Sequence, residues 1–430
     1  MSLASLFASP LARNRDFRLL FSAQVISLIG SGVTTVGLAL FAHQLVGGGG
    51  SAAVVIGNAL MLRILAFLLF SQPAGVLADR VNRKRMLILA DVVRFGLLAL
   101  FPFIESVWQV YVMIFLINAA TAFFTPTYDA TIPEVAGREH YVKALSLSRV
   151  AVDMEAMLAP VLAGVLVALL GLQWLFWFDA ASYLVSAALV AASSLHHVPK
   201  PPKQFSPGAF LRELGYGARI LLREASLRRA LIFSFVEAIA GAAAIVATVV
   251  YVRDILVLGE TAFVLTMAAL GVGSTIAALM LGRATGRYES KANSPFELHG
   301  LRHRWTERAL LLGGMVLGLL LLPGVLQPPL LVFVLLWFFN GVGQALIAIP
   351  SSTLLAEHTR EADRGRAYAA YFALTHAFWL IAYPAIGYGT SSLGAPLTFT
   401  LAGVACLLIT LGVLLTRKSS PDHVHDTRGT

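Results

Sequence analysis

Ionisable side chains inside long apolar runs are the residues of this sequence that could do chemistry. Glu237 lies in the run FSFVEAIAGAAA, which contains no basic residue. At 1.5 Å per helical residue it is about 12 Å from the nearer end of the run. A carboxyl group away from water holds its proton more firmly than one in water, which suits reversible proton binding. Glu237 is therefore a candidate for proton coupling or substrate binding.

Arg63 lies near the middle of another apolar run, 52–78. A charge at the centre of a membrane costs roughly 2.5–3.5 kcal/mol, so this arginine needs a carboxylate partner or a watery cavity. It either handles substrate or protons or forms a structural ion pair, and the sequence leaves both readings open. His376 is a second candidate proton carrier, although a lone histidine in such a run more often makes an interhelical hydrogen bond.

Arg149 and Asp153 lie four residues apart within the run 142–170. That spacing brings them together on one helix face, so we expect an ion pair that can line a cavity. Glu155 points to a different side of the same helix, so it is not expected to share a site with Asp153. Further acids in apolar runs are expected to be structural: Asp91, which is three residues from Arg94, and Asp179.

Two other groups of polar side chains recur at helical spacing. Asn340 and Gln344 share one face of an apolar run, and His376, Trp379 and Tyr383 share a face of the next run. These side chains offer hydrogen bonds and aromatic surface. They are candidates for a solute pathway.

Nothing in the sequence indicates covalent chemistry, a metal site or a cofactor. The chain has one cysteine, Cys406, and lacks His-Glu-x-x-His, Gly-x-Ser-x-Gly and phosphate-loop motifs. The GGGGS stretch at 47–51 is a flexible link. The longest polar stretch is too short for a nucleotide-binding domain. We therefore expect no enzyme, and any work must be driven by an ion gradient or by the solute.

The elements that must position these residues are membrane-spanning helices. The composition is 58% hydrophobic and 13% charged with a mean hydropathy of +0.78, whereas soluble domains carry about 25% charged residues. The net charge of +9 does not indicate nucleic-acid binding, because the basic residues are spread between apolar runs.

The fold class predicted is all-α, with twelve transmembrane helices in two six-helix bundles. Apolar runs long enough to cross a bilayer of ~30 Å recur along the chain. The expected spans are 17–43, 52–78, 86–104, 107–128, 142–170, 172–192, 229–252, 260–282, 307–326, 329–350, 366–389 and 395–416.

The basic residues predict the orientation. Arg63, Arg94 and Arg149 fall inside spans and Arg253 falls in a loop after the seventh, while the other Lys and Arg residues all lie on one side. Loops rich in Lys and Arg stay in the cytoplasm. We therefore expect both termini in the cytoplasm of a bacterial plasma (inner) membrane.

The chain divides into an N-terminal bundle (1–192), a linker (193–228), a C-terminal bundle (229–418) and a tail (419–430). Phe210, Leu214, Ile220 and Leu221 alternate with arginines in the linker, which predicts an amphipathic helix on the lipid surface. The polar stretch 283–306 is expected to be a mobile cytoplasmic loop.

Proline spacing indicates that the bundles arose by duplication. Pro126 and Pro350 are expected to end spans, and Pro160 and Pro384 follow them 34 residues later, inside spans. Gly164 and Gly387 follow those prolines, so the four residues Pro160, Gly164, Pro384 and Gly387 are predicted hinge or helix-packing positions. Repeated bundles with a solute site between them at mid-depth are a transporter architecture.

One loop resembles a family signature. GVLADRVNRKR, residues 75–85, resembles the loop Gly-x-Leu-Ala-Asp-Arg-x-Gly-Arg-Lys of the major facilitator superfamily, with Asn82 in place of the second glycine. We expect its glycine to let helices approach closely. The resemblance implies a gating latch, with Asp129 as a further partner, and the residues that it assigns to gating are Gly75, Asp79, Arg80, Arg83, Lys84 and Asp129.

The segments 123–147, 159–164 and 176–189 resemble bacterial drug, macrolide and siderophore exporters of that superfamily. This implies a monomeric secondary transporter that exports an amphipathic small molecule in exchange for protons. The antiporter motif of the fifth span is reduced to Ala159-Pro160-x-x-Ala163-Gly164, and the arginine often found in the fourth span is absent. A lipid flippase, an uptake symporter or facilitator, and a non-transporting scaffold are the alternatives.

Overall fold

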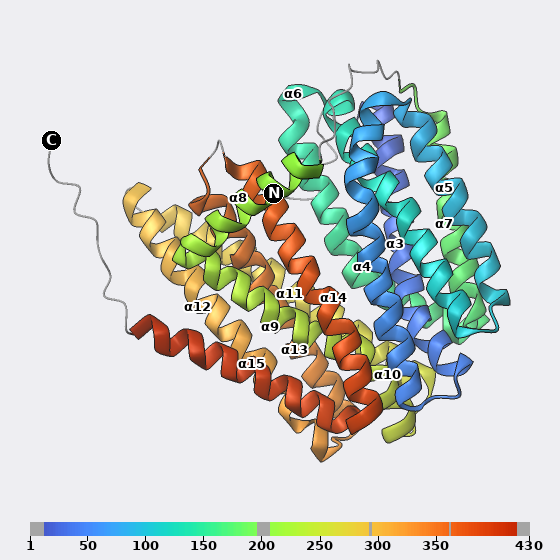
Figure 1. Ribbon diagram of the computed structural model, residues 1–430, viewed down its shortest axis with the longest axis vertical. Helices are drawn as coiled ribbons and strands as arrows, with labels where there is room; N and C mark the ends of the chain where they lie inside the picture. The colour runs from blue at the N-terminus through green and yellow to red at the C-terminus, as the bar shows by residue number, and fades with distance from the viewer. Residues whose placement is uncertain (1–12, 196–206, 292–294, 361–362, 419–430) are drawn as a thin grey trace, which may run out of the picture.

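The protein is described by a computed structural model that covers residues 13–195, 207–291, 295–360 and 363–418. Every regular element in these residues is a helix (Figure 1). The helices of the first part are α3 (Arg15–Leu45), α4 (Gly49–Arg80), α5 (Arg83–Leu100), η1 (Phe101–Phe103), α6 (Val107–Leu170) and α7 (Gln173–Ala192). The others are α8 (Pro207–Arg223), α9 (Ala225–Val246), α10 (Thr248–Val250), η2 (Tyr251–Ile255), α11 (Glu260–Lys291), α12 (Pro295–Leu321), η3 (Leu322–Leu326), α13 (Leu330–His358), α14 (Arg364–Leu393) and α15 (Ala395–Lys418).

The apolar runs fold as predicted, with one irregular case. Among the described residues, 11 helical segments are long and apolar enough to cross a membrane, and Leu158–Leu170 is a shorter apolar helix. That helix is the second part of the expected span 142–170, whose first part carries several charged residues. It belongs to α6, which contains a break at Gly137, where φ is 72°. The predicted all-α membrane fold is confirmed.

Three details of the expected boundaries were wrong. Pro126 lies inside α6, and Pro350 lies inside α13, which continues to His358. Prolines are tolerated within membrane helices because neighbouring groups satisfy the freed carbonyl. The stretch 283–306, expected to be a loop, is helical except at 292–294, which lie outside the described residues. The polar ends of α11 and α12 continue these helices beyond their apolar segments.

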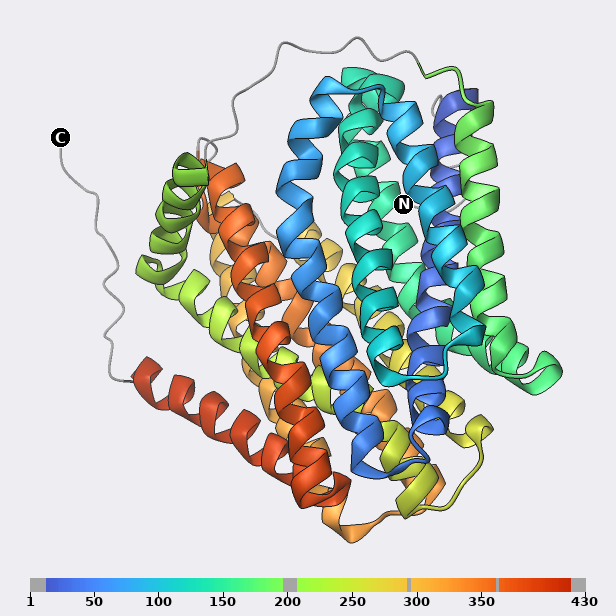
Figure 2. The same ribbon diagram turned by 45° about the vertical axis from the view of Figure 1, so that its right-hand side comes forward.

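The helices form two groups that meet at one end. Helices α3 to α7 make up the N-half, and α9 to α15 make up the C-half. We call the end that holds the start of α3, the turn at 81–82 and the start of α14 the basic end, and the other the opposite end. In both ribbon views the halves diverge towards the basic end, and α4 and α14 run side by side towards the opposite end (Figures 1 and 2).

The buried core follows the same division. One hydrophobic cluster contains residues of both halves, including Val55 of α4 and Ile386 of α14. A separate cluster belongs to the N-half alone and includes Phe17, Leu87 and Val190, which lie near the basic end. Among the described residues, the halves therefore share a core at the opposite end and not at the basic end.

Small residues let α4 and α14 pack backbone against backbone at the opposite end. A Cβ atom at Gly57 would lie 2.5 Å from the Tyr383 carbonyl oxygen, and one at Gly387 would lie 2.7 Å from that of Ala53. A Cβ at Gly50 would lie 2.3 Å from a backbone atom of α14. Larger side chains at these positions would hold the two helices apart.

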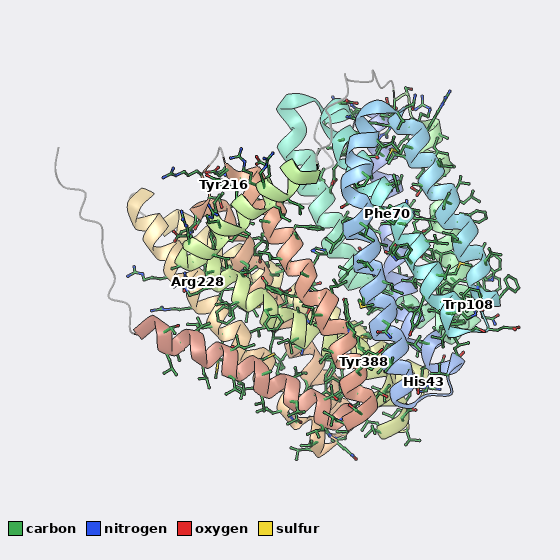
Figure 3. The ribbon with its side chains drawn as sticks, in the orientation of Figure 1. His43, Phe70, Trp108, Tyr216, Arg228 and Tyr388 are labelled. Carbon is green, nitrogen blue, oxygen red and sulfur yellow. The ribbon has the colours of Figure 1, made fainter. Side chains whose placement is uncertain are left out.

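Polar contacts join the halves at the same end. His43 Nε2 lies 2.9 Å from Asp254 Oδ1, and the Gly49 amide donates to Asp254 Oδ2 over 2.8 Å. Gln44 donates to Glu260 Oε1 over 2.8 Å. Figure 3 places His43 where α4 and α14 meet, together with the exposed Tyr388. The opposite end is therefore closed by both polar and apolar contacts.

The linker helix α8 packs on the C-half near the basic end (Figure 2). A Cβ at Gly217 would lie 2.2 Å from the Arg366 carbonyl oxygen, and Arg366 pairs with Glu213. Leu221 is buried, whereas Leu211 remains 65% exposed. The apolar face of α8 is therefore divided between α9 and α14 on one side and the outside on the other, and its contact with lipid stays a prediction.

Candidate functional site

Arg63 lies on the side of α4 that faces α14. It donates to Thr35 Oγ1 over 3.0 Å and interacts electrostatically with His376 and Tyr383 of α14. One turn further along α4, the Phe67 ring stacks on the ring of His376 with centroids 6.5 Å apart. Arg63 and His376, both predicted pathway residues, are therefore brought together across the boundary of the two halves.

Inside the N-half, Arg63 also lines a small cavity with both polar and apolar walls. Its other polar lining residues come from three helices: Ser31, Thr34 and Thr35 of α3, Asn118 and Thr121 of α6, and Asp179 and Tyr183 of α7. The space open to water in the cavity is ≈ 60 Å³, and a single water needs roughly 10–15 Å³ by the same measure. The cavity can therefore hold a few waters but not a drug-sized solute, which needs roughly 300–1,000 Å³.

Two carboxyl groups belong to this region, and neither was predicted to be functional. Asp179 is 1% exposed and accepts a hydrogen bond from Ser182 Oγ over 3.1 Å. Glu155 of α6 is half-buried and interacts electrostatically with Arg63. Glu155 is thus the acid that approaches Arg63. Arg149 and Asp153 belong to α6, but their side chains lie outside the described part of the chain, so their pairing stays a prediction.

Asp91 and Arg94 of α5 form a buried ion pair. Asp91 is 0% exposed and accepts a second hydrogen bond, 2.7 Å long, from Ser186 Oγ of α7. The guanidinium carbon of Arg94 lies 4.4 Å from the ring centre of Phe124 and 4.2 Å from that of Tyr183. Both charges are neutralised within one site, which agrees with the structural role expected for the pair.

In the C-half, Glu237 of α9 lies in a polar group shared with α14. Ser234 Oγ and the Tyr371 hydroxyl are 2.7 Å apart, and Glu237 interacts electrostatically with Tyr371. Glu237 is partly exposed. The structure therefore places this candidate beside hydroxyl groups, in the opposite half from Arg63.

The other polar candidates of the C-half pack within it. Gln344 donates to Asn340 Oδ1 over 2.8 Å, and Asn340 is fully buried, so this pair is joined on one face of α13. A Cβ at Gly241 of α9 would lie 2.2 Å from the Trp379 ring, so the indole packs across this glycine. Trp379 also contacts Tyr383 on its own helix.

The signature loop at 75–85 is tied to the rest of the N-half. Arg83 is 2% exposed, donates to the Ala130 carbonyl over 2.7 Å and pairs with Glu134 at 2.7 Å. Lys84 donates to the Ser193 carbonyl over 2.6 Å. Ser193 is the C-cap residue of α7, where cations are stabilised, whereas Ala130 lies inside α6. The basic residues thus join α5 to α6 and to the end of α7.

The other residues of the predicted gating set are Gly75, Asp79, Arg80 and Asp129. The ion pair of Arg83 uses Glu134, which follows the proposed partner Asp129 on α6 by five residues. A Cβ at Gly75 would have nothing within 4 Å in the described structure, so close helix packing, which was expected of it, is not its role in this conformation. The side chains of Asp79 and Arg80 lie outside the described residues.

Three of the four predicted hinge positions lie at boundaries between the halves. A Cβ at Gly164 of α6 would lie 2.4 Å from Val264 Cγ1 of α11, and Gly387 lies against α4. Pro384 is inside α14, next to the residue whose carbonyl meets Gly57, and Pro160 is inside α6. Among the described residues no group of three or more His, Cys, Asp and Glu is placed to hold a metal ion.

Two helical groups that meet at one end, with charged and aromatic side chains facing each other between them, define a membrane transporter. The sequence profile of the Major Facilitator Superfamily matches residues 20–296 and 300–429. The chain therefore belongs to this superfamily, as the signature loop predicted. It is a membrane transporter and not an enzyme.

Relatives of this chain include both uncharacterised and named transporters. The uncharacterised MFS-type transporter YfiS of Bacillus subtilis strain 168 is 24% identical over 413 residues, 94% of each chain. Macrolide efflux protein A of Streptococcus pyogenes is 24% identical over 216 residues, 49% of this chain and 52% of that protein. The enterobactin exporter EntS of Citrobacter koseri is 26% identical over 196 residues, 44% of this chain and 45% of that protein.

Solved structures share the fold at lower identity. A POT family transporter in complex with 5-aminolevulinic acid superposes with a TM-score of 0.69 at 11% identity, over 93% of this chain and 96% of that one. The nucleoside transporter NupG superposes with a TM-score of 0.69 at 15% identity, over 94% and 99%. These likenesses show the common fold of two helical halves.

Proposed function

We propose that the protein exports an amphipathic small molecule in exchange for protons. It works as a monomer, by alternating access, in the plasma membrane of a bacterium, with the basic end and both termini in the cytoplasm. The partial similarity to a macrolide efflux protein and to an enterobactin exporter supports both the direction and the solute class. In this orientation the halves meet on the outer side and diverge towards the cytoplasm, as expected of the state that loads an exported solute.

The proposal rests above all on the arrangement at mid-depth, where Arg63 and Phe67 of α4 face His376 and Phe372 of α14. Phe372 is 39% exposed and Tyr388, nearer the opposite end, is 56% exposed. Charge and exposed aromatic surface together suit a solute that is partly apolar and partly polar. A proton entering the cell down its gradient would drive the exchange, because the membrane potential supplies about 2.3 kcal/mol per charge per 100 mV.

The orientation is tested by labelling cysteines from outside intact cells with a membrane-impermeant maleimide. Cys406 is fully buried, so it is replaced by serine to give a cysteine-free parent. Val257, in the link after α10, is 80% exposed, and Arg85 is exposed at the basic end. We expect Val257→Cys to be labelled in intact cells and Arg85→Cys to be labelled only after lysis. The reverse pattern would refute the proposed orientation.

Transport is tested in proteoliposomes loaded with radiolabelled erythromycin or enterobactin as probes. A pH step of one unit is worth about 1.4 kcal/mol, so one-for-one exchange can concentrate a neutral solute roughly tenfold. We expect accumulation on the side that supplies protons, and collapse of the gradient when a protonophore is added. Protein-free liposomes are the background. The proposal would be contradicted if the flux of both probes were no greater than in protein-free liposomes. It would also be contradicted if the protein flipped an acylated lipid instead.

A further inference from the structure

Two carboxyl groups of the N-half lie against the same short segment of α3. A Cβ atom at Gly30 would lie 2.2 Å from Ser182 Oγ and 2.4 Å from Asp179 Oδ1. One at Gly32 would lie 2.4 Å from Ala159 Cβ and 3.2 Å from Glu155 Oε1. Glycine at both positions therefore lets α7 and α6 pack closely on α3, with the carboxyl groups of Asp179 and Glu155 beside the contacts. The groups come from different helices, α7 and α6, and interact electrostatically with each other. The two acids are therefore neighbours held by close helix packing on α3, and we call them the acid pair.

The charges around this pair do not balance if both acids are ionised. Asp91 and Arg94 neutralise each other within their own ion pair. Among the residues whose side chains the structure describes, Arg63 then remains to balance Glu155 and Asp179 together. An uncompensated charge buried in a protein costs several kcal/mol. One proton on the acid pair makes the group neutral.

The cavity beside Asp179 has room and polar lining groups for the waters that proton transfer needs. Its space of ≈ 60 Å³ open to water is lined by Arg63, Asp179 and the Thr34 hydroxyl, among others. Thr34 is 8% exposed, and its oxygen has no hydrogen-bond partner of good geometry, although it lies beside the Asp179 carboxyl. A water or another small polar molecule in the cavity would supply the hydrogen bond that the Thr34 hydroxyl lacks. A short chain of waters here can carry a proton to or from Asp179.

We infer that the proton exchanged for solute is held by the Glu155–Asp179 pair, opposite Arg63, and not by Glu237. The inference rests on the proposed proton exchange and assigns its site. With a proton on the pair, Arg63 balances the one remaining carboxylate. When the proton leaves along the cavity, Arg63 is drawn towards two carboxylates.

Arg63 is the positioning residue that would transmit this change to the other half. The same guanidinium that interacts with Glu155 also interacts with His376 and Tyr383 of α14. Movement of its charge towards the acid pair therefore weakens its interaction across the boundary at which the halves meet. Proton occupancy in the N-half is thereby coupled to the contact between α4 and α14.

The other titratable and charged groups around the pair are identified by helix. Tyr183 of α7 donates to or accepts from Ser31 Oγ of α3 over 2.8 Å, and Arg94 of α5 interacts electrostatically with Asp179. Arg149 and Asp153 of α6 add one charge of each sign by sequence, and their side chains lie outside the described residues. His376 of α14 interacts electrostatically with Arg63. Among the groups whose side chains are described, none changes the charge count that calls for one proton.

The site is tested without substrate by infrared spectroscopy of the full chain in lipid bilayers as a function of pH. We expect a carbonyl-stretch band of a protonated carboxylic acid that disappears as the pH rises. Asp179→Asn and Glu155→Gln are each expected to remove or displace this band. Glu105→Gln, in the exposed link before α6, is the matched control and should leave it unchanged. Glu155→Gln keeps the test decisive if the fully buried Asp179 proves essential for folding.

Three results would overturn the assignment. They are a band unchanged in both variants, a band removed by Glu237→Gln alone, and a band that shifts when sodium replaces potassium at constant pH, which would indicate a metal-cation site. In erythromycin-loaded proteoliposomes, Glu155→Gln should lose the roughly tenfold accumulation expected for a one-unit pH step, whereas Glu105→Gln should retain it. Wild-type vesicles without pH-driven accumulation would refute the proposed function, and the infrared result would still decide the proton site.

Discussion

Replacing Gly57 with valine is expected to force α4 and α14 apart at the opposite end and to stop erythromycin exchange in proteoliposomes. The new Cβ would lie 2.5 Å from the Tyr383 carbonyl oxygen and 3.1 Å from its carbon. Both atoms belong to backbone, so no side-chain rotation relieves the clash. Overpacking of this kind costs about 1–3 kcal/mol, which changes the ratio of two conformations roughly 5- to 150-fold. The conformation closed at the opposite end should therefore become a minor one.

The separation is measured by pulsed electron resonance between two spin labels at this end. Glu105→Cys in the N-half and Val257→Cys in the C-half carry the labels in a Cys406→Ser background, since both sites are exposed. We expect a longer distance in Gly57→Val than in the parent. Gly96→Val is the matched control, because a Cβ at Gly96 would have nothing within 4 Å. An unchanged distance with intact exchange would mean that this contact does not govern the state.

This contact was only partly predictable from the sequence. Gly387 was predicted because it follows Pro384, and Pro384 lies 34 residues after Pro350 just as Pro160 lies 34 residues after Pro126. Gly57 was not, since a glycine in an apolar run carries no information about which helix lies opposite. The spacing of Gly50, Ala53 and Gly57 on one face of α4 is a small-residue pattern typical of close helix packing. That pattern indicates a tight contact but does not identify α14 as the partner, which depends on how the two halves dock.

The candidate site was also only partly predictable from the sequence. Hydropathy predicted the helices well, because a span must satisfy its backbone internally and so leaves an unbroken apolar run. It also identified Arg63, whose charge stands out in such a run. The carboxylate that approaches it, Glu155, was not predicted, because the four-residue spacing of Arg149 and Asp153 favoured that pair instead.

A signal for Glu155 was present in the sequence. Glu155, Ala159 and Ala163 follow one another at four-residue intervals, and the two alanines are buried. A stripe of small residues on a helix indicates the side that packs closely on a neighbour. Here that neighbour is α3, because a Cβ at Gly32 would lie 2.4 Å from the Ala159 Cβ. Glu155 is on this inward side, and only its partners in other helices required the structure.

The buried Asp91–Arg94 pair should be the most sensitive point for stability. Arg94→Met is expected to destabilise the protein by about 3–5 kcal/mol, because it leaves a fully buried carboxylate without its counter-charge. The loss of two cation–π contacts adds to this effect, since each contributes roughly 0.5–2 kcal/mol. By comparison, single interhelical hydrogen bonds in membranes average about 0.6 kcal/mol. The expected loss therefore exceeds what removal of the Ser186 hydrogen bond alone would cause.

A second substitution separates charge from packing. The double variant Asp91→Asn with Arg94→Met removes both charges and keeps the Ser186 hydroxyl able to donate to the new amide oxygen. We expect it to recover most of the stability lost in Arg94→Met, as measured by thermal unfolding in detergent. Arg85→Met, at an exposed position on the same helix, should unfold like the wild type. If the double variant is no more stable than Arg94→Met, the arginine acts through its ring contacts with Phe124 and Tyr183, and the ion pair is not what stabilises α5 against α7.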